Sequence, residues 1–214
     1  FNNIGGRAKT VTIVSSSQAN NGFALASAKA LTQSRRLIDT QVQLKDFLHA
    51  LRKSSWVSLD TEADSLHSYP EKLCLLQISL PDTDVLIDPL QNLDMTVLFK
   101  ALASRELLIH GSDNDLRLMY AAHQFVPSKI FDTMWAARLL GFAAFGLNDL
   151  LSKLLDITLD KGSQKANWTR RPLTDKMANY ALNDSRHLRA LTFLLYTSDA
   201  ADDPRAQARA CSRR

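Results

Sequence analysis

The apolar positions of this 214-residue chain follow a strand-like pattern first and a helical pattern later. Short, nearly continuous apolar runs that end at polar or turn-forming residues predict buried β-strands. Six strands are predicted in this way, at residues 36–39, 56–60, 73–79, 85–88, 107–110 and 129–132. Four of the six precede residue 90, so strands dominate the first half of the chain.

Apolar residues spaced three and four apart predict amphipathic helices. The first helix begins after Thr40, whose side chain can cap it, and carries on one face Leu44, Phe47, Leu48 and Leu51. Further helices are predicted for residues 93–103, 113–123, 132–140 and 147–155. A final helix begins after the capping residue Thr174 and continues through Leu191.

The order of these elements predicts an α/β fold. Strands that follow one another directly predict an antiparallel opening section, and strands that alternate with helices afterwards predict parallel pairing. A fully parallel dinucleotide-binding sheet would alternate strands and helices from the start. The sequence contains no glycine-rich phosphate loop and no internal repeat. We therefore expect one mixed β-sheet flanked by α-helices.

Four carboxylates and one tyrosine are the candidates for chemistry. Asp60 and Glu62 are two residues apart at a strand end, so their side chains point to the same side. Tyr180 and Asp184 are four residues apart and share one face of the final helix, while Asp115 lies near the start of another helix. Carboxylates from distant parts of a chain suit hard divalent cations, and two such cations can drive phosphodiester cleavage.

Each of these motifs has a simpler explanation when it is taken alone. Asp60 and Glu62 could be a solvated strand end, and Asp115 could be an acid favoured by the helix dipole in a first turn. Tyr180 and Asp184 could be a core-facing tyrosine and a surface acid. The three motifs together, in this order and on these elements, indicate a metal site much more specifically than any one of them.

Charge, cysteine content and hydropathy narrow the class of protein. The formal net charge is +4, but residues 1–36 hold five basic residues and no acid, whereas residues 37–193 hold 17 basic and 19 acidic residues. The basic excess is therefore no evidence for a nucleic-acid partner. No apolar stretch reaches the roughly 18 residues of a membrane span. Cys74 and Cys211 form neither a disulfide framework nor a zinc motif, so we expect a reducing, cytoplasmic compartment and no membrane partner.

Both ends of the chain differ from the predicted domain. Residues 1–34 are rich in Ser, Ala, Asn and Gly, so we expect a disordered or non-native extension, with organelle targeting as an alternative. Residues 194–214 begin with a segment that resembles the translation of a sequencing adapter, so we expect an artefactual or disordered tail. The predicted domain therefore covers residues 35–193, and a C-terminal domain could be missing.

Several motifs together resemble the exonuclease domain of ribonuclease D, in the DEDD group with the tyrosine variant of the third motif. The resemblance spans residues 37–191 and is carried by residues 59–62, 75–78, 86–90, 110–112, 131–133, 168–173 and 180–184. It implies a ribonuclease-H-like fold with two divalent ions, Mg²⁺ or Mn²⁺. It also implies that the ions bind to Asp60, Glu62, Asp115 and Asp184. Tyr180 would orient the attacking water, because a phenol with a pKa near ~10 is a poor base at neutral pH.

Residues close to the acids in the sequence are candidates for substrate binding. They are Thr61, Leu66, His67, His110, Trp168, Arg170 and Arg171. Leu66 and His67 could form a wall for the last base, and the two arginines could bind phosphate. A buried, hydrogen-bonded role for His110 and a core-anchoring role for Trp168 are the alternatives. Gln77 lies in an apolar strand, and we expect its amide to be a core group with satisfied hydrogen bonds.

The resemblance implies a metal-dependent 3′–5′ exoribonuclease that releases nucleoside 5′-monophosphates, plausibly from tRNA and other stable RNA precursors. The preference for RNA rests on the resemblance alone, because the same acids serve DNA exonucleases. A DNA exonuclease of the Werner or proofreading type, acting on single-stranded DNA, is therefore the first alternative. The second is a non-catalytic nucleic-acid-binding module on the same fold, and the intact set of acids argues against it.

Overall fold

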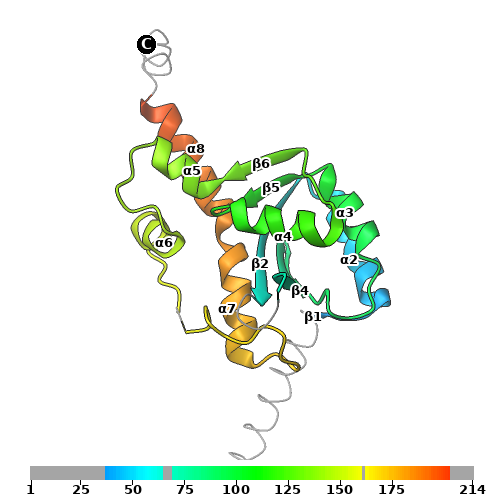
Figure 1. The fold of residues 1–214 in the computed structure, drawn as a ribbon. Helices are drawn as coiled ribbons and strands as arrows, with labels where there is room; N and C mark the ends of the chain where they lie inside the picture. Colours follow the sequence, from blue (N-terminus) through cyan, green and yellow to red (C-terminus); the bar gives the residue numbers. More distant parts are fainter. Residues whose placement is uncertain (1–36, 65–68, 161, 203–214) are drawn as a thin grey trace, which may run out of the picture. The chain divides into compact units, whose positions relative to one another are not determined.

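A six-stranded sheet lies at the centre of the residues that the structure, a computed structural model, describes: 37–64, 69–160 and 162–202 (Figure 1). The strand order is β1-β4-β3-β2-β5-β6. The strands are β1 (Leu37–Ile38), β2 (Trp56–Asp64), β3 (Lys72–Leu80), β4 (Thr83–Ile87), β5 (Glu106–Ile109) and β6 (Lys129–Asp132).

The pairing of the strands confirms the predicted mixed sheet. β2, β3 and β4 are antiparallel to one another, whereas β5 pairs parallel with β2 and β6 pairs parallel with β5. β1 adds a short parallel edge beside β4. β3 is buried along its whole length after Lys72, because helices cover both of its faces. This explains why its sequence is nearly continuous in apolar residues.

Three helices cover one face of the sheet: α2 (Gln41–Lys53), α3 (Met95–Ala103) and α4 (Asp113–His123). α2 begins where predicted, because the Thr40 side chain accepts a hydrogen bond from the backbone N–H of Gln43 in a capping box. Residues of these helices pack in one cluster with the sheet residues Leu59, Leu76 and Ile78. This cluster is the main hydrophobic core.

The opposite face of the sheet is covered by α7 (Asp175–Arg186). Its buried residues form a second cluster with sheet residues Leu75 and Leu86. A third cluster joins α5 (Thr133–Leu139), α6 (Leu147–Leu155) and α8 (Leu188–Asp202) beyond the β5–β6 side of the sheet (Figure 1). The acids predicted to bind metal are thus carried by elements that pack on different cores.

Two elements differ from the prediction in ways that affect the site. β2 continues to Asp64, because its pairing with β3 persists past Glu62 through a bulge. The predicted final helix is two helices separated at His187, since α7 packs on the sheet and α8 packs on α5 and α6. Each of the two helices packs on a different hydrophobic cluster, so a single straight helix could not pack on both.

The domain boundary expected at residue 193 falls inside α8. Leu195 is buried beside Leu191 in the third cluster, so packing continues past the expected boundary. The extension expected at residues 1–34, and the tail from residue 203, lie outside the described residues. Among the helices of the described part, none has the length and apolar character that a membrane crossing needs.

Candidate active site

The site is built on the second half of β2. β5 pairs with β2 only as far as Ser58, so beyond that point the β5 side of β2 opens toward the loop that leads into α4. Asp60 and Glu62 lie on this stretch and point to the face covered by α7, whereas Thr61 between them points to the face covered by α4. The strand therefore presents acids to one layer and a hydroxyl to the other.

Helix α7 contributes the second part of the site. Its N-cap is Thr174, whose side chain accepts from the backbone N–H of Met177, as predicted. Tyr180 and Asp184 lie one turn apart, and the Tyr180 hydroxyl donates a hydrogen bond to the Asp184 carboxylate. One carboxylate oxygen each from Asp60, Glu62 and Asp184 lie within 4.8 Å of one another. The structure thus brings together three of the four predicted metal ligands.

Asp115 reaches the site from the other layer. It lies in the first turn of α4 and is 6% exposed. The Thr61 hydroxyl donates to its Oδ1 at 2.5 Å, which ties α4 to β2 next to Asp60. After burial, the charge of Asp115 is the largest cause of the raised pKa of Asp60. Thr61 therefore positions the fourth acid.

Asp132 fixes the start of α4, a role that the sequence reasoning missed. Its carboxylate accepts hydrogen bonds from the backbone N–H groups of Gly111 (3.0 Å) and Ser112 (2.7 Å) just before α4. The same carboxylate caps α5 through Met134 and Trp135. Burial acts to raise the pKa of Asp132, but these donors hold it below its usual range. Gly111 adopts a φ of 72°, which the tight entry to α4 requires.

Burial raises the pKa values of all four acids, and the charges of neighbouring acids raise those of Asp60 and Glu62 further. Burial, followed by the charges of Asp115, Asp184 and Glu62, raises the pKa of Asp60 well above its usual range. Burial and the charges of Asp184 and Asp115 raise the pKa of Glu62 to about 9. Burial also raises the pKa of Asp115 and of Asp184 to about 6, against the hydrogen bonds from Thr61 and Tyr180. A site of this kind gains most from a bound positive charge.

The chemistry of the donors fits a hard divalent cation. All the ligand atoms that converge are carboxylate oxygens, which Mg²⁺ and Mn²⁺ prefer. Among the described residues, no lysine or arginine forms an ion pair with Asp60, Glu62, Asp115 or Asp184. A cation bound to these oxygens would neutralise the repulsion that raises their pKa values.

His110 is half-buried and hydrogen-bonded, which matches its alternative role only in part. Its Nδ1 lies 2.9 Å from the Thr133 hydroxyl, and that hydroxyl donates to the Ile109 carbonyl. In the tautomer with the proton on Nδ1, that nitrogen donates to the hydroxyl and Nε2 is an acceptor. Burial lowers the pKa of His110, so the ring is neutral at physiological pH. A substrate contact through Nε2 stays a prediction.

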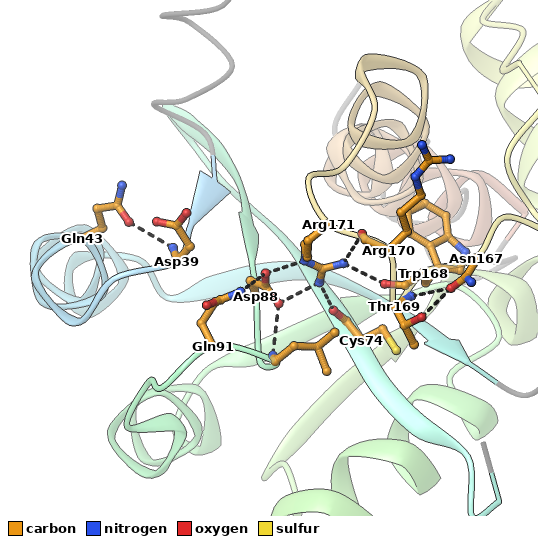
Figure 2. A network of polar contacts seen from close by, with 11 residues as sticks. Asp39, Gln43, Cys74, Asp88, Gln91, Asn167, Trp168, Thr169, Arg170 and Arg171 are labelled. Atoms are coloured by element: carbon orange, nitrogen blue, oxygen red, sulfur yellow. Dashed lines mark hydrogen bonds and ion pairs between the residues drawn. The ribbon is translucent and has the colours of Figure 1, made fainter. Parts of the chain in front are cut away.

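The three candidates in the segment before α7 take different positions. Trp168 is 2% exposed and packs near Tyr180, with ring centroids 6.2 Å apart, in agreement with the core-anchoring alternative. Arg170 is exposed. Arg171 is turned inward and bonds to Asp88 and to three backbone carbonyls (Figure 2). Only Arg170 of the two arginines presents a free surface for the expected phosphate contact.

Leu66 and His67 lie outside the described residues, so the wall expected for the last base stays a prediction. Gln77 is fully buried as expected, but neither atom of its amide has a hydrogen-bond partner among the described residues. Its strand position is directly opposite Asp60. The expectation of a satisfied core amide is therefore wrong, and the apolar run around Gln77 gave no signal of this.

A cavity of about 200 Å³ adjoins Tyr180 and Asp184. Its wall includes the N-terminus of α6 with Asn148 and Asp149, and Gln164 from the following loop. These polar residues were not among the sequence-based candidates, because a short helix after a glycine has no distinctive motif. The cavity gives the acid cluster an open side.

A comparison with models of known protein families identifies the family of this domain. A family model described as 3′–5′ exonuclease matches residues 35–195, which is most of the chain and includes every site residue discussed above. This chain belongs to the ribonuclease D family of 3′–5′ exonuclease domains. The ribonuclease-H-like fold expected from the sequence is confirmed by the likeness to a solved ribonuclease D structure, described below, and by the order of the strands in the sheet.

Relatives within this ribonuclease D family include two proteins named Ribonuclease D. One, from Desulfotalea psychrophila, is 38% identical over 163 residues, which cover 74% of this chain and 44% of the relative. The other, from Bartonella henselae, is 33% identical over 164 residues, which cover 75% of this chain and 40% of the relative. The chain thus spans less than half the length of these relatives.

Solved structures of similar proteins support the same fold. Escherichia coli RNase D, described as an exoribonuclease involved in structured RNA processing, has a TM-score of 0.71 and 26% identity, covering 81% of this chain and 48% of that one. Brucella melitensis NrnC with bound Mg²⁺ has a TM-score of 0.62 and 26% identity, covering 75% of this chain and 81% of that one. NrnC was also solved bound to pGG.

Proposed function

We propose that this domain is a metal-dependent 3′–5′ exoribonuclease that removes nucleoside 5′-monophosphates from RNA 3′ ends. The observation that carries the proposal is the convergence of Asp60, Glu62 and Asp184 oxygens within 4.8 Å, next to Tyr180. Membership in the ribonuclease D family supports the class of reaction.

Two divalent ions fit the arrangement of the acids. Asp60, Glu62 and Asp184 would hold one ion, and Asp60 with Asp115 would hold the second, since the charge of Asp115 acts on the pKa of Asp60 more strongly than that of any other acid. Bound there, Mg²⁺ or Mn²⁺ would lower the pKa of the attacking water and stabilise charge on the phosphate and leaving oxygen. The solved NrnC structure with Mg²⁺ supports the choice of metal.

Tyr180 acts as a positioning hydroxyl in this proposal. Burial and the charges of Asp184 and Glu62 raise its pKa above the usual value, so the phenol keeps its proton at neutral pH. The hydroxyl donates a hydrogen bond to Asp184, and its oxygen can accept a hydrogen bond from water. Tyr180 would therefore hold the attacking water in line without removing its proton.

The 3′ end of RNA would enter beside Tyr180 and Asp184. The cavity there offers amide and carboxylate groups from Asn148, Asp149 and Gln164 for contacts with a base or ribose. The exposed Arg170 is available for a backbone phosphate. The names of the relatives and the description of E. coli RNase D favour RNA, with stable RNA precursors such as tRNA as the substrate class.

A reducing, cytoplasmic compartment fits the buried, unpaired Cys74.

Cleavage of matched substrates tests this proposal. A 5′-labelled single-stranded RNA and its DNA counterpart are incubated with the protein in Mg²⁺, in Mn²⁺ and in EDTA. We expect a one-nucleotide ladder that starts from the 3′ end of the RNA, much slower cleavage of the DNA, and none in EDTA. Comparable rates on RNA and DNA would contradict the assignment as a ribonuclease, and faster cleavage of DNA would favour an exonuclease of the Werner or proofreading type. No cleavage of either would contradict the enzyme.

A further inference from the structure

Arg171 joins three separate segments of the chain (Figure 2). Its Nε and Nη2 donate to the two oxygens of Asp88, at 2.6 and 2.7 Å. Nη2 also donates to the Cys74 carbonyl at 2.8 Å, and Nη1 donates to the carbonyls of Trp168 and Arg170 at 2.8 and 2.9 Å. All three guanidinium nitrogens therefore bind protein. The bidentate pairing with Asp88 fixes the plane and direction of the group.

Asp88 is a firm anchor for this arginine. It follows β4 directly and is 1% exposed. Its Oδ1 accepts from the backbone N–H of Leu90 at 3.1 Å, and its Oδ2 accepts from the Gln91 amide at 3.3 Å. The Asp88 carboxylate is therefore held in place by its own neighbours in the chain as well as by Arg171. Arg171 is fixed relative to the sheet, because both Asp88 and Cys74 belong to the β3–β4 region.

The segment that Arg171 fixes leads directly to Tyr180. On one side lies Trp168, a buried residue whose ring packs against Tyr180 with 6.2 Å between centroids. On the other side Leu173 packs in the same cluster, and Thr174 caps the helix that carries Tyr180. Tyr180 itself is only partly buried. Its position therefore depends on Trp168 and on where α7 begins.

A second ion pair holds the C-terminal end of α7 to β4. Arg186, in the last turn of α7, donates from Nε to Asp84 of β4 at 2.7 Å. Tyr180 and Asp184 lie between the two arginine contacts. Hydrogen bonding between Ser185 and Ser79 adds a contact from α7 to β3. Polar contacts just before α7 and in its last turn thus help to set its register on the sheet, in addition to apolar packing.

We propose that Arg171 and Asp88 are positioning residues for the Tyr180 hydroxyl, which they control through Trp168 and the start of α7. This proposal rests on the function proposed above. It gives Arg171 an indirect role in the reaction in place of the phosphate contact expected from the sequence. The direct contact with substrate is left to its exposed neighbour, Arg170.

A kinetic double-mutant cycle tests the dependence on Tyr180. Single-turnover cleavage of a 5′-labelled RNA is measured at saturating Mg²⁺ for Arg171→Lys, Tyr180→Phe and the double variant. Arg171→Lys keeps the charge but loses the bidentate geometry. We expect it to slow cleavage roughly 10- to 100-fold with KM changed less than about twofold, as for a displaced positioning group. In the Tyr180→Phe background the same change should cost less than about twofold.

Fluorine NMR gives a readout that does not require cleavage. The chain has four tyrosines, so replacement by 3-fluorotyrosine gives a simple spectrum in which Tyr180→Phe identifies the resonance of Tyr180. We expect Arg171→Lys and Asp88→Asn to shift or broaden that resonance. Arg105→Lys is the matched control, since Arg105 bonds to the Arg52 carbonyl beside the opposite end of β2 and should leave the resonance unchanged.

The outcomes separate the two proposals. An equal rate loss for Arg171→Lys with and without Tyr180, or an unchanged Tyr180 resonance, overturns the positioning role. If Arg171→Lys does not fold, Asp88→Asn replaces it in both measurements, since it preserves the shape of the anchor. A wild-type protein that cleaves no RNA refutes the proposed function, while the resonance still decides whether Arg171 controls Tyr180.

Discussion

Two groups of carboxylates in this domain have opposite surroundings. Asp132 accepts four backbone N–H groups, and Asp88 accepts the bidentate contact of Arg171. The acids Asp60, Glu62 and Asp184 instead face one another, with no basic side chain paired to them among the described residues. The first group fixes loops and helix starts, and the second group carries unbalanced charge.

This difference separates structural acids from acids that await a ligand. Hydrogen-bond donors hold the pKa of Asp132 below its usual range even though burial opposes them. Burial and mutual repulsion drive the pKa of Asp60 and of Glu62 in the other direction. Carboxylates that the fold leaves uncompensated, unlike Asp132, are the candidates for binding a cation.

The largest expected effect comes from removing an acid of the unbalanced group. Asp60→Asn should reduce cleavage by at least about 10³-fold, because the shared ligand of both proposed ions is lost. Cleavage assays give the rate, and calorimetric titration with Mn²⁺ should show weakened binding. Circular dichroism should remain that of the wild type. Cleavage at the wild-type rate would refute the metal assignment.

Removing the partner of a structural acid should instead destabilise the fold. Arg171→Ala leaves Asp88, which is 1% exposed, without its cation, and should cost about 3–5 kcal/mol of unfolding free energy. Urea unfolding in EDTA measures this. The matched control is Arg117→Ala, which breaks the exposed pair with Asp113 and should cost less than about 1 kcal/mol. Equal costs for the two variants would contradict the structural role of Asp88.

A smaller loss is expected from removing the Tyr180 hydroxyl, which is proposed to hold the attacking water. Tyr180→Phe should lower the rate of cleavage roughly 10²-fold, because the ring and its packing on Trp168 remain while the positioning hydrogen bond is lost. The affinity for Mn²⁺ should stay close to that of the wild type. An unchanged rate would remove Tyr180 from the mechanism.

The pH dependence of stability tests the raised pKa values of the unbalanced group. The folded-state pKa of Glu62 is about 9, and those of Asp115 and Asp184 are about 6, all above the unfolded values of 4.5 or 3.8. The folded protein therefore binds more protons than the unfolded chain, and stability in EDTA should fall as pH rises from about 4 to 9. Thermal melts across this range measure the fall, and Mg²⁺ should reduce it.

The same unbalanced charge makes a second variant informative. In EDTA at pH 8, Asp60→Asn should raise the melting temperature by about 2–4 °C, which corresponds to roughly 1 kcal/mol for a chain of this size. In Mg²⁺ the melting temperature of the wild type should rise to at least that of Asp60→Asn, because the bound cation offsets the repulsion among the acids. A lower melting temperature for Asp60→Asn in EDTA would show that Asp60 stabilises the metal-free fold, against its raised pKa.

Period and spacing were sufficient to predict the acids and most of the elements. Asp60 with Glu62 follows from the strand period, and Tyr180 with Asp184 follows from the helix period. These local rules predict which side chains share a face. They do not predict where a helix must change direction, so the break at His187 was missed, since it arises from the packing of α7 and α8 on different cores.

Contacts between distant segments were the part that local patterns could not supply. Nothing near Arg171 in the sequence indicates that its partner is Asp88, 83 residues earlier. The same is true of Asp132, whose contacts with Gly111 and Ser112 cross from one βα connection to another. An arginine next to a predicted site looks like a phosphate ligand until the tertiary fold shows which way it points.

Asp115 and Asp184 approach the site from helices that belong to opposite layers of the domain. Any ion held jointly by this set acts as a cross-link between the two cores, through Thr61 on one side of β2 and Asp60 on the other. Amide hydrogen exchange in α4 and in α7 should therefore slow together when Mg²⁺ is added. Metal binding at such a site would then depend on the packing of both layers, including residues far from the acids.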